Sequence, residues 1–329
     1  MKMRRLISQF TSQLNEALTI GEKVRFNKTN KEIRSIVITG LGGSGIGGKI
    51  ASQLVSKQLK VPVLINNDYS LPSFINENTL VIVSSFSGNT EETLYALKVA
   101  QAKNTEIACI TSGGKLKEIA ESNNYNCVIL PKAFSPRAML TYSIVQQLYL
   151  FYYYELIDNT FVKEIKSTIK VLENCVDDIK DLAHQIALSL HNKTFIIYSE
   201  ASFEGVAIRL RQQINENSKC LGWHHVVPEM NHNELVGWAG GKPEYTVLIL
   251  RSSYEYKRSS IRLDITREII KKYTSNVIEI KAVGNTFIEQ SFYHILLGDW
   301  ISVYLAELNQ VDDVEVKVID YLKSELAKI

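Results

Sequence analysis

Residues 80–92 read Leu-Val-Ile-Val-Ser-Ser-Phe-Ser-Gly-Asn-Thr-Glu-Glu, an apolar run followed by a polar turn. The apolar run, residues 80–83, predicts a buried β-strand. The residues after the turn predict an amphipathic helix, and the spacing of Asn89 and Glu92 predicts a capping box at its start. A strand that passes through a short turn into a helix is the building unit of a parallel α/β sheet.

The turn within this stretch is suited to binding an anion. The first turn of a helix presents backbone N–H groups and the positive end of the helix dipole. Four side chains can add uncharged hydroxyl donors, namely Ser84, Ser85, Ser87 and Thr90. A phosphate group that must be released again fits such a turn, although an ordinary capped turn would use the same residue types.

The strand–helix order recurs along both halves of the chain. In the first half, strands are expected at residues 35–39, 61–65, 80–83, 107–111 and 127–130. In the second half, they are expected at residues 194–198, 247–250 and 277–280. We therefore predict an α/β protein with two tandem domains, each a mostly parallel sheet flanked by helices on both faces, with N- and C-terminal helices. The predicted segments are residues 1–155, a helical connection of residues 156–192, and residues 193–329.

Composition excludes several classes of protein. The chain has 329 residues, of which 45% are hydrophobic and 22% are charged, and its net charge is +2. This charge gives no electrostatic ground for binding nucleic acid or an acidic membrane, and no apolar run reaches the length of a membrane span. The four cysteines show no zinc-like or C-x-x-C spacing, so we expect free thiols and a cytoplasmic location.

A glycine-rich loop follows the first expected strand. Residues 40–48 contain G-x-G-x-x-G at Gly40, Gly42 and Gly45, which is the dinucleotide-binding pattern, and Asp68 lies where a ribose-binding acid would be expected. An NAD-dependent oxidoreductase is therefore a competing interpretation. A dinucleotide fold needs one phosphate-binding turn, whereas residues 84–90 would provide a second, so a small phosphorylated molecule is favoured over NAD.

The second half holds one dense cluster of unusual polar residues, spread over residues 215–219, 223–225 and 228–238. Glu216 lies at the end of an expected helix, and His232 lies in a polar stretch typical of a ligand-side loop. Either residue could serve as an acid or base. The pair His224 and His225 has no third ligand at useful spacing, so we expect no metal site.

Five motifs of the chain resemble the bifunctional phosphoglucose/phosphomannose isomerase family, whose members are built from two sugar isomerase (SIS) domains. They are Gly-Leu-Gly-Gly-Ser-Gly-Ile-Gly-Gly (40–48), Ser-Phe-Ser-Gly-Asn-Thr-Glu-Glu-Thr (85–93), Ser-Pro-Arg-Ala (135–138), Asn-Glu-Asn-Ser-Lys (215–219) and Pro-Glu-Met-Asn-His-Asn-Glu-Leu-Val-Gly-Trp (228–238). The resemblance covers essentially the whole chain. The first two motifs are shared by SIS proteins in general, whereas the last is far more specific to this family.

The resemblance implies a role for individual residues. Gly43 and Ser44 would contact the open-chain sugar, while Ser85, Ser87 and Thr90 would hold its phosphate. Arg137 would lie near the reacting carbons, Glu216 would be the catalytic base, and His232 would open the ring. The family also places a lysine of the last helix in the site; Lys323 is the match, with Lys317 and Lys328 as alternatives. It further implies a homodimer whose active sites lie at the subunit interface, with His232 supplied by the neighbouring chain.

The implied reaction interconverts fructose 6-phosphate with glucose 6-phosphate, mannose 6-phosphate or both. A proton moves between C1 and C2 through a cis-enediol(ate), a reaction that requires neither a nicotinamide cofactor nor a metal. Two alternatives remain at this point, the NAD-dependent oxidoreductase and a non-catalytic SIS protein that binds a sugar phosphate to regulate a partner. Such sensors usually carry a DNA-binding helix-turn-helix module, for which the N-terminal ~30 residues are too short. The sequence does not decide between the two aldose substrates.

Overall fold

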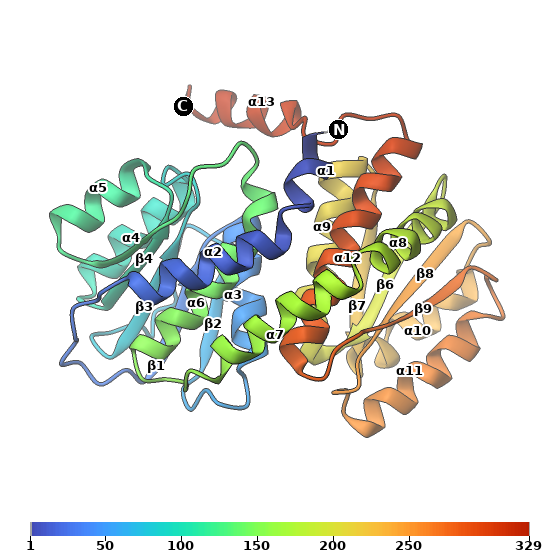
Figure 1. Cartoon of the computed structure of the whole chain (residues 1–329), viewed down its shortest axis with the longest axis horizontal. Helices are drawn as coiled ribbons and strands as arrows, with labels where there is room; N and C mark the ends of the chain where they lie inside the picture. The colour runs from blue at the N-terminus through green and yellow to red at the C-terminus, as the bar shows by residue number, and fades with distance from the viewer. Residues whose placement is uncertain (1, 329) are drawn as a thin grey trace. The chain divides into compact units, whose positions relative to one another are not determined.

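The computed structural model describes residues 2–328. Their packing divides the chain into two compact units. One unit runs from Gln9 to Lys170; the other contains the residues from Val171 onward together with the N-terminal segment that ends at Ser8. Each unit has its own parallel sheet with helices on both faces, so the predicted fold class is confirmed (Figure 1).

The Gln9–Lys170 unit is built on a five-stranded sheet of order β2-β1-β3-β4-β5, in which every pairing is parallel. Its strands are β1 (Ser35–Thr39), β2 (Val63–Asn66), β3 (Thr79–Ser84), β4 (Glu106–Thr111) and β5 (Asn126–Ile129). All six residues of β3 are buried, as the continuous apolar run predicted. The central position of β3 places the turn that follows it in the middle of the sheet edge.

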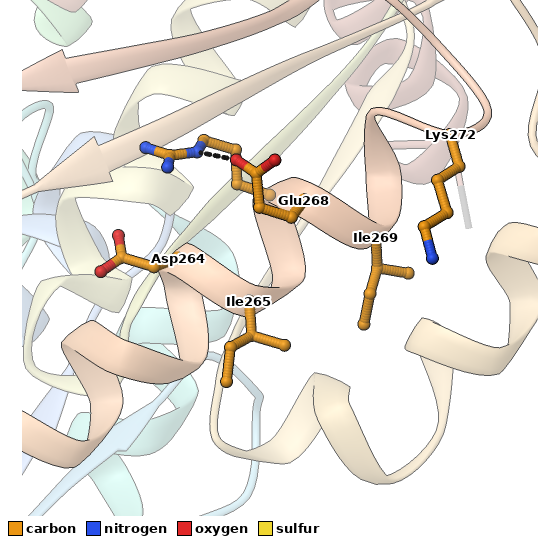
Figure 2. Close-up of a pocket in the computed structure, with 6 residues that line it drawn as sticks. Asp264, Ile265, Glu268, Ile269 and Lys272 are labelled. Carbon is orange, nitrogen blue, oxygen red and sulfur yellow. Dashed lines mark hydrogen bonds and ion pairs between the residues drawn. The ribbon is translucent and has the colours of Figure 1, made fainter.

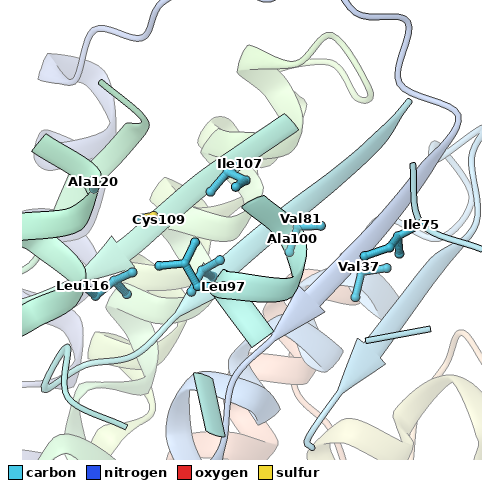
Figure 3. Packing of buried hydrophobic residues seen from close by; sticks show 10 residues of the cluster. Val37, Ile75, Val81, Leu97, Ala100, Ile107, Cys109, Leu116 and Ala120 are labelled. Carbon is cyan, nitrogen blue, oxygen red and sulfur yellow. The ribbon is translucent and has the colours of Figure 1, made fainter. Parts of the chain in front are cut away.

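The helices of this unit cover both faces of the sheet. They are α2 (Phe10–Lys23), α3 (Gly42–Leu54), α4 (Glu91–Ala102), α5 (Gly114–Ser122), the short η1 (Pro136–Met139), α6 (Leu140–Tyr153) and the first part of α7 (Thr160–Asn174). On one face, Leu97 of α4 and Leu116 of α5 pack with Val37, Val81 and Cys109 of the strands, a cluster shown in Figure 3. Burying a leucine of this kind contributes about 1.5–3 kcal/mol.

The opposite face is covered by α3 and α6, and the approach of α3 depends on glycines. A Cβ at Gly47 would lie 2.2 Å from the Ser143 hydroxyl oxygen of α6, and one at Gly48 would lie 2.6 Å from Ile38 of β1. Glycines at these two positions are therefore required for the close packing of α3 between α6 and β1, in addition to any role of the glycine-rich loop in binding a ligand.

The second unit is built on a four-stranded parallel sheet of order β7-β6-β8-β9. Its strands are β6 (Thr194–Glu200), β7 (Gly222–Val227), β8 (Tyr245–Arg251) and β9 (Val277–Lys281). Its helices are α1 (Lys2–Ile7), the end of α7, α8 (Val176–Leu190), η2 (Ala201–Phe203), α9 (Glu204–Ser218), η3 (Glu229–His232), α10 (Glu234–Gly237), η4 (Trp238–Gly240), α11 (Lys257–Ile270), α12 (Phe287–Leu308) and α13 (Lys317–Leu326).

Among the longer elements of this unit, β7 and α11 were not predicted. The Trp223-His224-His225 run lies inside β7, where two adjacent histidines interrupt the apolar pattern by which a strand is recognised. The sequence of α11 carries charged residues along most of its length, and only four of its residues are buried. Each element takes its structure from the core it covers, because its own apolar pattern is weak.

Helices α9 and α12 meet through a buried ion pair. The Arg209 guanidinium donates to both carboxylate oxygens of Asp299, at 2.9 and 3.1 Å, and both side chains are almost fully buried. A Cβ at Gly298 would lie 2.9 Å from Leu210, so the two helices are in close contact at this point. The pair fixes how α9, which carries Glu216, lies on α12.

The predicted connection, residues 156–192, consists of α7 and α8. The division between the packing units falls inside α7, and α1 packs in the second unit, where Arg4 forms an ion pair of 2.7 Å with Glu307. The single N-terminal helix expected from the sequence is thus two helices, α1 and α2. The domain segments 1–155, 156–192 and 193–329 stay a prediction. Within residues 2–328, no helix is both long enough and apolar enough to cross a membrane.

Candidate functional site

The turn after β3 gathers the hydroxyls that the sequence singled out. Ser85 is buried, and its hydroxyl oxygen lies 2.8 Å from that of Thr90, the residue that precedes α4. The Gly88 N–H donates to the Ser85 hydroxyl at 3.2 Å, and the Asn89 N–H donates to the exposed Ser87 hydroxyl at 3.2 Å. Gly88 has a φ of +71°, and a Cβ there would lie 1.8 Å from the Gly113 carbonyl oxygen. Only glycine fits this turn.

The capping box predicted from Asn89 and Glu92 is wrong. Helix α4 begins at Glu91 and has Thr90 as its N-cap residue, without a hydrogen bond from the Thr90 side chain to the helix. The Asn89 side chain instead accepts from the backbone N–H of Lys115, at 3.0 Å, in the first turn of α5. Because its own cap side chain turns toward Ser85, the first turn of α4 keeps N–H donors for an anion.

The glycine loop is joined directly to this turn. The Ser44 hydroxyl, in the first turn of α3, accepts from the Phe86 N–H at 3.2 Å. A Cβ at Gly40 would lie 2.6 Å from the Ser84 carbonyl oxygen, so the ends of β1 and β3 approach closely. The two ligand-facing turns inferred from the sequence therefore form one continuous surface at the carboxyl edge of the sheet, where parallel sheets bind ligands.

Arg137 lies beside the same loop. A Cβ at Gly43 would lie 3.7 Å from the Pro136 carbonyl oxygen and 3.8 Å from the Arg137 Cα atom. Arg137 is the second residue of η1 and is only 8% exposed. The Gln9–Lys170 unit thus brings together one buried cation, a glycine loop and a hydroxyl-lined turn, which between them offer a phosphate and a polyhydroxylated chain their complementary groups.

The dinucleotide interpretation draws no support from Asp68. Its side chain is exposed and accepts from the neighbouring Tyr69 N–H at 2.6 Å. The side chain that reaches the glycine loop is Asn67, whose amide donates to the Gly40 carbonyl oxygen at 2.5 Å. A Cβ at Gly45 would lie 2.5 Å from that amide nitrogen. Asn67 therefore supports the loop, while Asp68 behaves as a solvated turn residue.

The corresponding turn of the second unit, after β8, has its donors already occupied. There the Glu255 carboxylate accepts from the Ser252 N–H at 2.8 Å and from the Arg251 guanidinium at 3.0 Å. Gln290 accepts from the Ser252 hydroxyl at 2.7 Å and from the Ser253 N–H at 3.0 Å. A cavity of about 590 Å³ lies over these residues, but an anion entering it would have to displace a carboxylate. The turn after β3 is thus the better anion site.

Glu216 is in the last turn of α9 and is partly buried. The neighbouring positions hold this turn against α12, since the Asn217 amide donates to the Ser302 hydroxyl at 2.9 Å and the Ser218 hydroxyl donates to the Ser302 carbonyl oxygen at 2.7 Å. Lys219 follows in a left-handed conformation, with a φ of +58°. Glu216 therefore projects from a rigid element, as a base that must be held over a substrate requires.

His232 is the last residue of η3, and its side chain is exposed. It lies between Met230, which is fully buried, and Trp238, which is 4% exposed. His224 and His225 lie on β7, where adjacent side chains point to opposite faces of the sheet. They cannot share a metal ion. Within residues 2–328, no group of three or more His, Cys, Asp or Glu side chains is placed to hold one.

Lys323 and the alternative Lys317 lie on α13, whereas the other alternative, Lys328, follows the end of that helix. Lys323 is exposed on α13, a helix that buries none of its residues. Lys317 is the first residue of that helix, and Lys328 forms an exposed ion pair of 2.6 Å with Glu325. Glu216, His232 and Lys323 thus come from three elements of one unit, whereas the loop, turn and arginine come from the other.

A second cavity, of about 280 Å³, lies along the outer side of α11. Figure 2 shows Ile265 and Ile269 on this side of the helix, between the charged side chains of Asp264, Glu268 and Lys272. None of the predicted site residues lines this cavity.

Comparisons with known proteins agree with this description. A family model described as SIS domain matches residues 31–154, and one described as bacterial phospho-glucose isomerase C-terminal SIS domain matches residues 179–326. The chain is 42% identical over 328 residues to a bifunctional phosphoglucose/phosphomannose isomerase of Caldicellulosiruptor bescii, covering 96% of both chains. It is 35% identical to a protein of the same name from Aquifex aeolicus, covering 90% of this chain and 91% of the other.

Among solved structures, the C-terminal domain of glucosamine-fructose-6-phosphate aminotransferase from Francisella tularensis superposes with a TM-score of 0.75 at 14% identity. The match covers 95% of this chain and 98% of that one. At this level of identity the likeness concerns the fold, two successive SIS units, and not the reaction.

Proposed function

Because the chain belongs to the bifunctional phosphoglucose/phosphomannose isomerase family, we propose that it interconverts fructose 6-phosphate with glucose 6-phosphate and mannose 6-phosphate. It is an isomerase. In our proposal the aldose–ketose isomerisation passes through a cis-enediol(ate). The observation that carries the proposal is the surface formed by the Ser85–Thr90 turn and the glycine loop, which Ser44 joins at the Phe86 N–H. It offers a phosphate several uncharged donors, and Arg137 lies beside the same glycine loop.

The phosphate end holds the substrate without taking part in the chemistry. The hydroxyl groups of Ser85, Ser87 and Thr90 bind the phosphate, and Gly43 and Ser44 contact the open-chain sugar. Hydroxyl groups are compatible with release of the product, because they add no permanent charge. Binding energy from this remote group is used to hold C1 and C2 in place under the base.

Three side chains carry the proton transfers. Glu216 removes the proton from one carbon and returns it to the other. Arg137, which is permanently cationic, stabilises the negative charge that develops on the enediolate oxygen. His232 protonates and deprotonates the ring oxygen as the sugar ring opens and closes. Lys323 is assigned to the site from the family resemblance alone.

One site can act on both aldoses. The enediol intermediate is planar at C2, so protonation from one face gives the glucose series and protonation from the other gives the mannose series. The ratio of the two products depends on how the open chain is held around its C1–C2 bond.

We also propose that the active protein is a cytoplasmic homodimer in which His232 serves the neighbouring chain's site. The exposed position of His232 is compatible with this role. Helix α13 exposes the apolar side chains of Val318, Tyr321 and Leu322, which a partner could cover. All four cysteines are free thiols, as suits a reducing compartment.

The test is a coupled assay that starts from fructose 6-phosphate and follows glucose 6-phosphate and mannose 6-phosphate separately. The proposal expects both products without added cofactor. Binding of fructose 6-phosphate without turnover would instead support a sensor. An NAD affinity with no effect of any sugar phosphate would support an oxidoreductase. Sedimentation or light scattering at assay concentration tests the dimer.

A further inference from the structure

The segment that carries His232 is fixed to its own unit on both sides of the imidazole. Before His232, Met230 is fully buried, and the Asn231 amide donates to the Thr266 hydroxyl of α11 at 2.9 Å. After it, the Asn233 side-chain amide oxygen accepts from the backbone N–H of Glu234 at 2.6 Å. Between these two attachments, His232 presents its imidazole to solvent.

Glu234 provides the main polar attachment. A single carboxylate oxygen, Oε1, accepts from the Tyr198 hydroxyl of β6 at 2.5 Å and from the Trp223 indole N–H of β7 at 2.8 Å. The Trp238 indole N–H in turn donates to the Tyr198 hydroxyl oxygen at 3.0 Å. The Glu234 carboxylate therefore connects the His232 segment to two neighbouring strands, β6 and β7. Its Oε1 atom already accepts two hydrogen bonds from the protein.

The Tyr198 side of this attachment is buried, where a hydrogen bond to a charged group is strong, whereas Trp223 is 37% exposed. Tyr198 is 0% exposed and Trp238 is 4% exposed. Burial raises the pKa of Tyr198, and its hydrogen bond to Glu234 raises it further, so the phenol stays a donor at any physiological pH. Tyr245 packs edge-on against both indoles, at 5.8 Å from Trp223 and 6.1 Å from Trp238.

We propose that Glu234 is a positioning residue, which holds His232 in the geometry needed for ring opening by accepting the Tyr198 and Trp223 hydrogen bonds. The proposal rests on the proposed function of His232. It gives a use to the glutamate and the tryptophan of the Asn-His-Asn-Glu-Leu-Val-Gly-Trp motif, neither of which takes part in the proton transfers. Displacing a reacting group by about 1 Å costs on the order of 10²-fold in rate.

The test is a double-mutant cycle between the two residues. Glu234→Ala is expected to lower kcat for glucose 6-phosphate by about 10²-fold, with a smaller change in KM. Added to His232→Ala, the same substitution should lower kcat by no more than about twofold, because it acts through the imidazole. Glu234→Gln, which keeps an acceptor oxygen, should restore kcat to within a few-fold of wild type. Glu244→Ala, an exposed carboxylate next to β8, is the matched control.

A second readout does not depend on activity. The protein has three tryptophans, and two of them, Trp223 and Trp238, lie in this network. Their fluorescence should change in Glu234→Ala and in Tyr198→Phe but stay unchanged in His232→Ala. Equal losses of kcat from Glu234→Ala in the presence and absence of His232 would overturn the proposal, as would a wild-type kcat in Glu234→Ala.

Two other results, a variant that does not fold and a wild-type protein without turnover, can be distinguished from those above. If Glu234→Ala does not fold, Tyr198→Phe removes one of the two donors and takes its place in the cycle. If the wild-type protein shows no isomerase turnover, the proposed function itself fails, whereas the fluorescence series still reports whether Glu234 anchors the segment.

Discussion

The hydroxyl oxygens of Ser85 and Thr90 lie 2.8 Å apart across the turn between β3 and α4. Ser85 follows directly after the buried strand β3 and Thr90 is the N-cap residue of α4, so this one contact connects the two ends of the turn. It also draws the Thr90 side chain away from capping its own helix. The turn is thereby arranged before any ligand arrives, which lowers the entropic cost of binding a phosphate.

Removing either hydroxyl should weaken substrate binding more than catalysis. For Ser85→Ala and Thr90→Val we expect KM to rise by about tenfold to a hundredfold, since a hydrogen bond to a charged group is worth about 1.5–3 kcal/mol. The change in kcat should be smaller, because the phosphate is remote from C1 and C2. Steady-state kinetics with fructose 6-phosphate test this, with Ser122→Ala on the exposed side of α5 as control. A loss confined to kcat would place these hydroxyls at the reacting carbons instead.

Glu216→Gln should fold normally and lose isomerase turnover. Gln cannot accept the proton, and a positioned base contributes about 10²–10⁴-fold, so kcat should fall by at least that factor. Circular dichroism and thermal unfolding should match wild type, because α9 keeps its Asn217 and Ser218 contacts to α12. Glu244→Gln serves as the control carboxylate. Activity within a few-fold of wild type would remove Glu216 from the role of base.

Arg137→Ala should lower kcat by about 10²–10³-fold, the loss typical of one oxyanion-stabilising donor. KM should rise less, because the charge that Arg137 meets is largest in the transition state. Arg137 is 8% exposed, so Arg137→Met, which fills more of its space, separates the loss of charge from the loss of packing. The two variants should share the kcat defect. An effect on KM alone would make Arg137 a phosphate-binding group.

His294 should make the unfolding free energy depend on pH. Burial lowers the pKa of its imidazole from 6.5 to about 4 in the folded protein, while Nε2 lies 3.0 Å from the Arg251 carbonyl oxygen. Between these pH values the unfolded chain binds the proton and the folded chain does not, so stability present above pH 6.5 is lost as the pH falls toward 4. The free energy of unfolding should fall by about 3 kcal/mol over this pH range through His294.

Urea unfolding of wild type and His294→Phe at pH 7 and pH 4.5 measures this contribution. The free energy of unfolding should fall with pH by about 2–3 kcal/mol more in wild type than in the variant. His184→Gln, at an exposed position, should keep the wild-type dependence. Parallel behaviour of wild type and His294→Phe would show that His294 is accessible to protons in the folded state.

Much of the fold could be predicted from local pattern. Residues 80–83 of β3 are all apolar because the strand is buried on both faces. The glycine-rich loop after β1 indicates that backbone segments approach each other closely there. Strand β7 and helix α11 were not found, since polar histidines interrupt the former and charges line the latter. In both, packing against the sheet overrides a weak local signal.

The candidate site, like the fold, could be predicted from the sequence only in part. The hydroxyls of the β3–α4 turn, the arginine after Pro136 and the motif around His232 could be picked out because unusual residues cluster within a few positions of sequence. The hydrogen-bond partners of those residues could not be predicted from the sequence. Asn89 was predicted to cap α4 and instead binds the Lys115 N–H of α5, a residue 26 positions away. Glu234 belongs to a motif that the sequence shows, but its hydrogen-bond donors, Tyr198 and Trp223, lie on strands β6 and β7.

The parallel α/β architecture, the family and the residue types available for sugar-phosphate chemistry can be read from local stretches of the chain, because they follow from periodicity and from short motifs. Which side chains support the site and which stay available for a ligand depends on the tertiary structure. It joined the glycine loop to the phosphate turn through Ser44, filled the equivalent turn of the second unit with Glu255, and committed Glu234 to Tyr198 and Trp223. Each of these is a hydrogen bond whose geometry depends on strand order and packing, which no single stretch of sequence contains.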